Sequence, residues 1–291
     1  MTHWTPAAGE NPPPEWLDAQ YNNRARIPEH PQIFQRWAAA SALARGSMPG
    51  RLDLRYGPGP KETLDIFPTD AANAPVLVFI HGGYWRSLDK SDFSFLAPVF
   101  TQAGWLVVVP NYDLCPAVGI DDIALEMTRA LAWTWHHAAE HGGDRRRIGV
   151  IGHSAGGHLA AMMLACHWKQ VDADLPEDLV RRAMSISGLH DLRAVAQVPH
   201  LQADLRLSPE TARRVSPALF PAPAGMLYAL AGEFESEEFL RHNALMREAW
   251  GEAVVPVCDT IAGRNHLDIV TDLADPQARL HRLALELLTR P

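Results

Sequence analysis

The chain has 291 residues, of which 47% are apolar, and its 26 Lys and Arg residues against 34 Asp and Glu give a net charge of −8. This length suits one domain with a large core, and the acidic balance offers no electrostatic basis for binding nucleic acid or an anionic membrane. Three cysteines without CxxC spacing argue against a disulfide framework and for a reducing compartment. The N-terminus does not read as a signal peptide, and no apolar run approaches ~18 residues, so we expect a cytoplasmic protein.

The first 45 residues read as a helical extension of a single domain that spans 1–291. Residues 1–14 are rich in Pro, Gly and Ala, which favours irregular structure. A helical turn is expected at 15–21, and a helix at 33–43, where apolar residues recur at helical spacing. The extension has no core of its own, so it must pack on the main body.

Strands and helices then alternate along the chain. Strands are predicted at 52–56, 63–67, 76–80, 105–109, 148–151, 183–187, 226–231 and 254–257, with the first two paired at an edge. Helical patterns cover 90–102, 121–140, 155–167, 237–250 and 277–289. This alternation predicts an α/β fold with a mostly parallel sheet between helices, in which function gathers at the carboxyl ends of the strands.

Residues 189–224 interrupt the alternation with several prolines and short helical pieces. An insertion between two late strands is a place for a small helical cap over a site. An ordinary long surface connection is the alternative interpretation.

The motif GHSAG at 152–156 follows one predicted strand and precedes an apolar helix. In this strand–turn–helix context GxSxG is typical of a nucleophile, because small flanking residues allow a strained turn that exposes the serine. The helix N-terminus also favours developing negative charge beside the serine. We therefore expect Ser154 to be the nucleophile.

The motif HGGYW at 81–85 follows the predicted strand at 76–80. Glycines let a backbone approach a substrate carbonyl closely, and this type of loop donates N–H groups to an oxyanion. The expected donors are Gly82 and Gly83, joined by Ala155 after the nucleophile. His81 is interpreted as a structural residue that holds the loop.

The base is expected to be His266, in the loop GRNHL before the last helix. An acid should follow the strand at 226–231, where it can orient the imidazole. Glu233 and Glu235 compete for this role, and the spacing favours Glu235 because three residues past the glycine leave room for a turn. Asp259 is a reserve acid.

Aromatic residues near these motifs are candidate pocket walls. Tyr84 and Trp85 follow the glycines directly, while Trp37 and Phe234 are further candidates for which core packing is the alternative. His137 and His141 have i,i+4 spacing but neither a third ligand nor the HExxH pattern, so no metal is expected. No organic cofactor is expected either.

Four motifs together, HGGYW, GHSAG, GEFESEEF at 232–239 and NHLDIV at 265–270, resemble the kynurenine formamidase (arylformamidase) branch of the α/β-hydrolase superfamily. This branch is related to hormone-sensitive-lipase-like carboxylesterases. The resemblance covers most of the chain and includes LDAQYN at 17–22, whereas 193–224 matches least well. It implies a Ser–Asp–His triad on Ser154 and His266, with the acid on Glu235, where glutamate replaces aspartate.

The sequence thus predicts a serine acyl hydrolase that acts through an acyl-enzyme. Its substrate would be a small carboxylic ester or an aryl formamide resembling N-formylkynurenine. The alternatives are a non-catalytic small-ligand binding protein on the same fold and an acyltransferase with the same triad. The oligomeric state stays open, a homodimer included.

Overall fold

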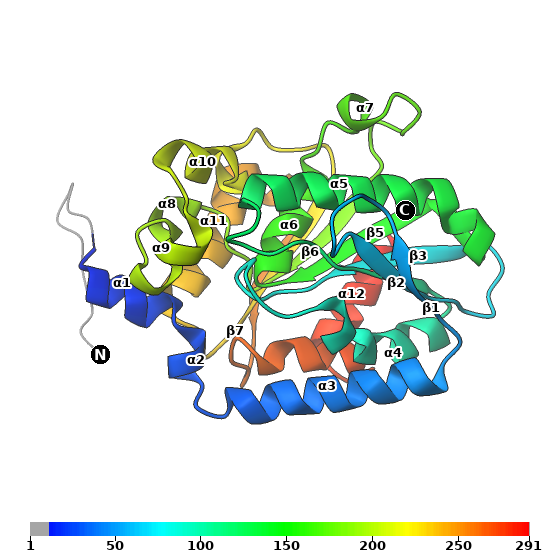
Figure 1. Cartoon of the computed structure of the whole chain (residues 1–291), viewed down its shortest axis with the longest axis horizontal. Coiled ribbons are helices and arrows are strands. Elements are labelled where there is room, and N and C mark those ends of the chain that lie inside the picture. Colours follow the sequence, from blue (N-terminus) through cyan, green and yellow to red (C-terminus); the bar gives the residue numbers. More distant parts are fainter. Residues whose placement is uncertain (1–11, 291) are drawn as a thin grey trace.

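A central sheet of eight strands organises the chain in a computed structural model that describes residues 12–290 (Figure 1). The predicted irregular segment 1–14 lies mostly outside the described residues. The strand order is β1-β2-β4-β3-β5-β6-β7-β8. The strands are β1 Arg51–Arg55, β2 Thr63–Phe67, β3 Ala74–Ile80, β4 Leu106–Pro110, β5 Gly143–His153, β6 Arg182–Ile186, β7 Met226–Gly232 and β8 Val257–Ile261.

The sheet is mostly parallel, as the alternation of elements predicts. Strand β2 pairs antiparallel with both β1 and β4, and every pairing from β4 to β8 is parallel. The central strands are almost wholly buried, because helices cover both faces and leave no water-facing side. The paired edge strands and the α/β fold are therefore confirmed.

Helices form two layers on this sheet (Figure 1). One face carries α5 and α6, which share a hydrophobic cluster with β3 and β5, and α11 packs against β7 and β8. The other carries α3, α4 and α12, which share a second cluster. The longer helices are α1 Pro14–Tyr21, α3 His30–Ser47, α5 Ile120–His137, α6 Ala155–Leu164, α11 Glu237–Val254 and α12 Arg279–Thr289.

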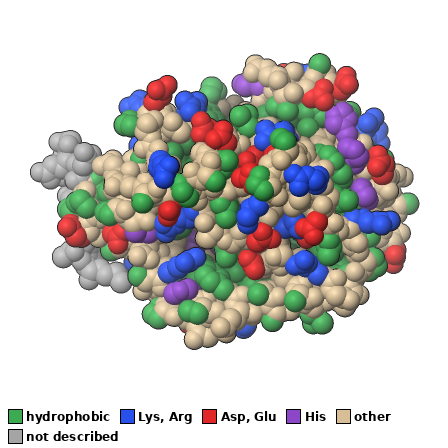
Figure 2. All heavy atoms as spheres, viewed as in Figure 1, with side chains coloured by type: hydrophobic (Ala, Val, Ile, Leu, Met, Phe, Trp, Pro, Cys, Tyr) green, Lys and Arg blue, Asp and Glu red, His purple; other side chains and the backbone are tan. Residues whose placement is uncertain are grey.

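Short helices and 3₁₀ turns complete the chain. None of the helices described is long and apolar enough to cross a membrane. On the face shown in Figure 2, acidic and basic side chains are interspersed rather than gathered by sign. The short elements are α2 Asn23–Arg26, η1 Lys90–Asp92, η2 Ser94–Leu96, α4 Ala97–Gln102, η3 Ala138–His141, α7 Trp168–Val171, α8 Leu192–Val195, α9 Pro199–Leu205, α10 Pro209–Arg214, η4 Pro217–Leu219 and η5 Asp268–Ala274.

One predicted strand, at 254–257, is wrong. Helix α11 continues to Val254, the side chain of Val255 is buried in the core, and the strand β8 begins only at Val257. Pro256 has no N–H for a sheet hydrogen bond, which is one reason why pairing starts after it. The apolar run therefore spans the end of α11 and the first residue of β8, instead of forming a strand of its own.

The insertion at 189–224 folds into the short helices α8, α9 and α10, which gather with α1 at one end of the molecule (Figure 1). Prolines open α9, α10 and η4, as their fixed φ favours at a first helical turn. An ion pair joins Arg86 to Asp204 of α9, and His200 of α9 contacts Asp18 of α1. The insertion is thereby attached to both α1 and the loop after β3.

Buried histidines attach the insertion and α1 to the core. The ring of His158 on α6 donates from Nε2 to the carbonyl of Val215 at 2.7 Å. His242 on α11 accepts the N–H of His190 at 3.1 Å, and its other ring nitrogen contacts the Tyr21 hydroxyl at 3.0 Å. These contacts bring four distant segments together around buried polar groups.

We expect stability to fall as the pH is lowered from 7 to 5. Burial lowers the pKa of His158 to about 4 and that of His242 to about 3, while burial and the nearby His266 lower that of His153 to about 3. In the unfolded chain these rings gain protons below about pH 6.5, whereas in the folded chain they stay neutral. Each ring therefore lowers the free energy of unfolding by about 1.4 kcal/mol per pH unit in this window. Urea unfolding at pH 7, 6 and 5 measures the effect.

Glu126 acts in the opposite direction, because burial raises its pKa to about 7 and the folded state then holds its proton more tightly. Burial raises the pKa of Asp92 and Asp268 in the same direction. Burial also lowers the pKa of His81 and His190, so five buried histidines oppose these carboxyl groups and the net sign is a loss of stability at low pH. A free energy of unfolding that stays constant or rises between pH 7 and 5 would contradict the assignment of neutral buried rings.

Candidate active site

Ser154 lies at a sharp turn between β5 and α6. Its backbone has φ 56° and ψ −118°, a sparsely populated conformation for a residue with a side chain, which costs about 1–3 kcal/mol. A Cβ at Gly152 would overlap the carbonyl of Gly156, and one at Gly156 would overlap that of Ile80. Only glycine therefore fits on either side of the turn, which explains the GxSxG spacing.

His266 reaches Ser154 from the loop between β8 and η5. Its Nε2 lies 3.0 Å from Ser154 Oγ. The ring packs against Phe239, with centroids 4.4 Å apart, and its backbone carbonyl accepts the Nε2–H of His153 at 2.7 Å. His153 thus acts as a neutral donor that positions the loop of His266 beside the serine.

Glu235 completes a chain of hydrogen bonds. Its Oε2 accepts the Nδ1–H of His266 at 2.7 Å, and its Oε1 accepts the Ser187 hydroxyl at 2.5 Å and the Gly232 N–H at 2.7 Å. The side chain is fully buried. A carboxylate held by two further donors has a fixed orientation and can fix the tautomer of the imidazole.

The two competing acids lie elsewhere. Glu233 is exposed and accepts the N–H of Gly263, two residues into the loop after β8. Asp259 is exposed on β8 and pairs with Arg279 of α12. The structure therefore brings together Ser154, His266 and Glu235, as the sequence analysis favours.

The loop after β3 places Gly82 and Gly83 beside the serine. A Cβ on Gly82 would lie 3.0 Å from the Ser154 Cβ, and Gly83 has φ 115°, where a Cβ would overlap the Ser87 carbonyl. The N–H of Ala155 points from the first turn of α6. Among the backbone hydrogen bonds that the described turns, loops and helix caps make, none has the N–H of Gly82, Gly83 or Ala155 as its donor.

His81 holds this loop from beneath. Its ring lies between the Gly82 carbonyl, at 2.7 Å, and Asn111 Oδ1, at 3.0 Å, and it stacks on Tyr112 with centroids 4.2 Å apart. Burial lowers the pKa of His81. Asn111 also donates to Asp89 at 2.7 Å, which ties the far end of the loop to β4.

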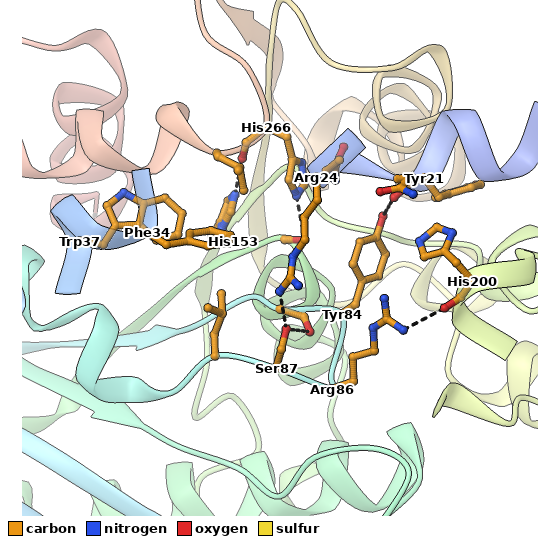
Figure 3. A pocket seen from close by; sticks show the side chains of 16 residues that line it. Tyr21, Arg24, Phe34, Trp37, Tyr84, Arg86, Ser87, His153, His200 and His266 are labelled. Atoms are coloured by element: carbon orange, nitrogen blue, oxygen red, sulfur yellow. Dashed lines mark hydrogen bonds between the residues drawn. The ribbon is translucent and has the colours of Figure 1, made fainter. Parts of the chain in front are cut away.

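A pocket opens above Ser154 (Figure 3). Tyr84 lines it, and Phe34 and Leu267 add apolar walls. Trp37 lies behind Phe34 at the edge of the pocket, but it is only 2% exposed and packs in the core, the alternative that the sequence left open. The polar lining of the pocket includes Asn23, Arg24, Arg86, Ser87, His153 and His200. The side chains that line the pocket thus include some from the loop after β3, from the N-terminal segment and from the insertion.

Two predicted walls are wrong. Trp85 is fully buried beneath the loop, where its ring packs edge-on against His158 at 5.1 Å, because its positive φ of 55° turns the side chain into the core. Phe234 is 64% exposed and lines a neighbouring depression that also includes Asn265 and His266. Neither side chain lines the pocket above Ser154.

Sequence reasoning missed several residues of the site. Ser187, which binds Glu235, follows β6 and has a positive φ of 55°, but an isolated serine after a strand carries no motif. Asn23, Arg24 and His200 come from short helices outside the repeating pattern. Their proximity to Ser154 is a consequence of tertiary packing alone.

No metal-ligand cluster of three or more His, Cys, Asp or Glu side chains occurs among residues 12–290. The pair with i,i+4 spacing, His137 and His141, instead lies against Trp133, with centroids 4.2 and 6.2 Å away. His137 also hydrogen-bonds the Trp133 carbonyl. This pair therefore packs against an aromatic ring.

Several known proteins are similar to this chain in sequence and fold. The family model BD-FAE matches residues 64–213. Kynurenine formamidase of Danio rerio is 28% identical over 267 residues, 86% of this chain and 88% of its own. The crystal structure of a candidate thioesterase from Silicibacter sp. TM1040 has 32% identity and a TM-score of 0.80, covering 94% of this chain and 99% of that one.

The thermostable carboxylesterase EstE1, from a metagenomic library, shares the fold with a TM-score of 0.65 at 20% identity, over 95% of each chain. The family match spans more than half of the chain, and the similarity to kynurenine formamidase extends over most of it. The chain therefore belongs to the BD-FAE family and is a hydrolase with an α/β-hydrolase fold that is similar over most of its length to kynurenine formamidases.

Proposed function

We propose that Ser154, His266 and Glu235 are the catalytic triad of a serine acyl hydrolase that cleaves a small carboxylic ester or an aryl formamide. The observation that carries this proposal is the unbroken chain of hydrogen bonds from Glu235 through His266 to the hydroxyl of Ser154. It ends at a pocket that is lined by both aromatic and polar side chains. A binding protein without catalysis would have no need for this alignment.

In the first step, His266 accepts the Ser154 proton while Oγ attacks the substrate carbonyl carbon. The carbonyl oxygen becomes an oxyanion, which the N–H groups of Gly82, Gly83 and Ala155 stabilise. Each such donor contributes about 3 kcal/mol to the transition state. The adjacent N-terminus of α6 adds a favourable dipole.

In the second step, the tetrahedral intermediate collapses and His266 protonates the departing alcohol or amine. An acyl-enzyme remains, which is a formyl-enzyme if the substrate is a formamide. His266 then takes a proton from a water molecule, whose oxygen attacks this ester. The bond from the acyl carbon to Oγ breaks, His266 returns the proton to Ser154 Oγ, and the acid is released. Glu235 stays ionised throughout and stabilises the imidazolium that forms twice per cycle.

The pocket supports a flat aromatic group on the substrate. Tyr84 and Phe34 are among the side chains that line it, with the buried Trp37 behind Phe34, and aromatic pairs favour stacked or edge-to-face contacts. The similarity to a kynurenine formamidase over most of the chain supports an aryl formamide, and the esterase relatives support a small ester.

Replacing the nucleophile gives the first test. A fluorophosphonate probe should label the wild-type protein at Ser154, and Ser154→Ala should lose both the label and hydrolysis, by more than about a thousandfold. Mass spectrometry of the labelled peptide locates the adduct, and Ser47→Ala, which removes a hydroxyl on α3 outside the pocket, serves as the labelled control. An unlabelled wild-type protein, or full activity in Ser154→Ala, would refute the enzyme mechanism.

The choice of acid is tested by a matched pair. Glu235→Gln should lower kcat by roughly a hundredfold or more, because a neutral amide neither stabilises the imidazolium nor fixes its tautomer. Glu233→Gln changes an exposed glutamate two residues away and should leave kcat near the wild-type value. Steady-state kinetics on one ester suffices, and equal losses in both variants would contradict the assignment.

Substrate class is tested by comparing kcat/KM for N-formylkynurenine and for short p-nitrophenyl esters. We expect measurable turnover of both, with the formamide comparable to the best ester despite its less reactive carbonyl. A formamide value orders of magnitude below the esters would remove formamide hydrolysis from the proposal and leave the esterase reading. Product analysis with an added alcohol detects acyl transfer in place of hydrolysis.

A further inference from the structure

The side chain of Asn111 ties together the two ends of the loop that follows β3. Asn111 comes directly after β4 and is only 4% exposed. Its Oδ1 lies 3.0 Å from Nε2 of His81, at the start of the loop, and accepts the N–H of Lys90, near its end, at 3.2 Å. Its Nδ2 donates to Asp89 at 2.7 Å. One carboxamide therefore closes the whole segment 81–90.

The orientation of this carboxamide is fixed by its partners. An ionised carboxylate only accepts and a backbone N–H only donates, so the amide nitrogen must face Asp89 and the oxygen must face Lys90. The carboxylate is itself held, because Lys61 donates to one oxygen at 3.2 Å and the N–H of Ser91 to the other at 3.1 Å. Burial would raise the pKa of Asp89, but hydrogen bonds from Ser91 and Asn111 help to lower it well below its usual range.

The backbone that carries this side chain is fixed as well. The N–H of Asn111 donates to the Thr63 carbonyl of β2 at 2.8 Å, and its carbonyl accepts the Tyr56 hydroxyl at 2.6 Å. The ammonium group of Lys90 is buried and donates to the buried carboxylate of Asp65, also on β2, at 2.6 Å. The edge strands of the sheet thus hold the loop after β3 through Asn111 and Lys90.

Between its two ends this loop is strained. Gly83, Tyr84, Trp85 and Leu88 all have positive φ, and three of them carry side chains. Such conformations persist only where the surrounding structure determines them. If the ends were released, the loop would relax, and the N–H groups of Gly82 and Gly83 would move away from their places beside the nucleophile.

We propose that Asn111 is a positioning residue of the oxyanion hole, which sets where the N–H groups of Gly82 and Gly83 lie relative to Ser154 Oγ by tying the two ends of their loop together. This inference rests on the proposed hydrolase function. Asn111 is not among the described residues that line the pocket, so it acts through the loop and not on the substrate. Oxyanion donors must lie at hydrogen-bond distance from the developing charge, and a misplacement of about 1 Å can cost roughly a hundredfold in rate.

Exchanging the amide and the carboxylate tests the pair directly. Asn111→Asp keeps an acceptor for the ends of the loop but places a second carboxylate oxygen against Asp89. We expect kcat for p-nitrophenyl acetate to fall by roughly a hundredfold and KM to change far less. Adding Asp89→Asn restores one donor and one acceptor across the pair, so the double variant should recover most of the lost kcat. An unchanged kcat in Asn111→Asp, or no recovery in the double variant, would overturn the proposal.

Asn243 provides a matched control for stability. It is a second buried asparagine, 7% exposed, whose Nδ2 donates to the Asp259 carbonyl at 3.1 Å from α11, a helix that packs against β7 and β8. Asn243→Ala and Asn111→Ala should both lower the unfolding temperature, because each loses buried hydrogen bonds. Only Asn111→Ala should lower kcat. Equal losses of kcat in the two variants would reduce Asn111 to a stabilising residue and refute its positioning role.

Hydrogen exchange separates this proposal from the hydrolase proposal, because it needs no turnover. In Asn111→Ala, but not in Asn243→Ala, backbone amides in the peptide that covers 81–92 should exchange faster than in the wild-type protein. Unchanged exchange there refutes the positioning role, whether or not Ser154 proves to be a nucleophile. A wild-type protein that takes up no fluorophosphonate refutes the hydrolase, and faster exchange in Asn111→Ala still supports the hold of Asn111 on the loop.

Discussion

The hydrogen bond between the Glu235 carboxylate and the His266 ring is the interaction on which the site depends. It links the loop after β7 to the loop after β8, and His266 then reaches the turn after β5. Backbone pairing continues past the strand ends to hold this alignment, because Ser154 N–H donates to Ile186 O at 2.8 Å and Ser187 N–H to Leu230 O at 2.6 Å. The parallel register of four strands therefore sets the geometry of the triad.

Backbone strain is concentrated at the same edge of the sheet. Ser154, Ser187, Tyr84 and Trp85 all have positive φ although none is glycine. Such conformations persist only where surrounding packing determines them, and here Trp85 and its neighbour His158 are fully buried. The rigid core beneath the loops thus holds the serine hydroxyl, its oxyanion donors and the acid's second partner in place.

Selection of the substrate involves a different part of the chain from the chemistry. The proposed catalytic groups follow the strands of the sheet, whereas the pocket walls come from α2, α3 and α9. The neighbouring helix α1 and the insertion that contains α9 are attached to the core through the buried contacts of His242 and His158. Variation in them can change the pocket while the triad geometry stays constant, which agrees with the weak match of 193–224 to the family it resembles.

The sequence by itself determined the alternation of strands and helices, the positions of Ser154 and His266, and the preference for Glu235. Each of these follows from local rules, since buried strands need apolar runs and a strained turn needs small neighbours. The strand at 254–257 failed because a short apolar run can equally end a helix. Apolar character alone cannot say which partner buries a side chain.

Only the tertiary structure decided which side chains meet above Ser154. It turned Trp85 into the core, left Phe234 on the surface, and brought Arg24 to within hydrogen-bonding distance of Ser87, 63 residues away. Ser187 became a partner of Glu235 through the register of β6 and β7. These contacts join segments distant in sequence, and their geometry is fixed by how whole elements pack rather than by the residues on either side.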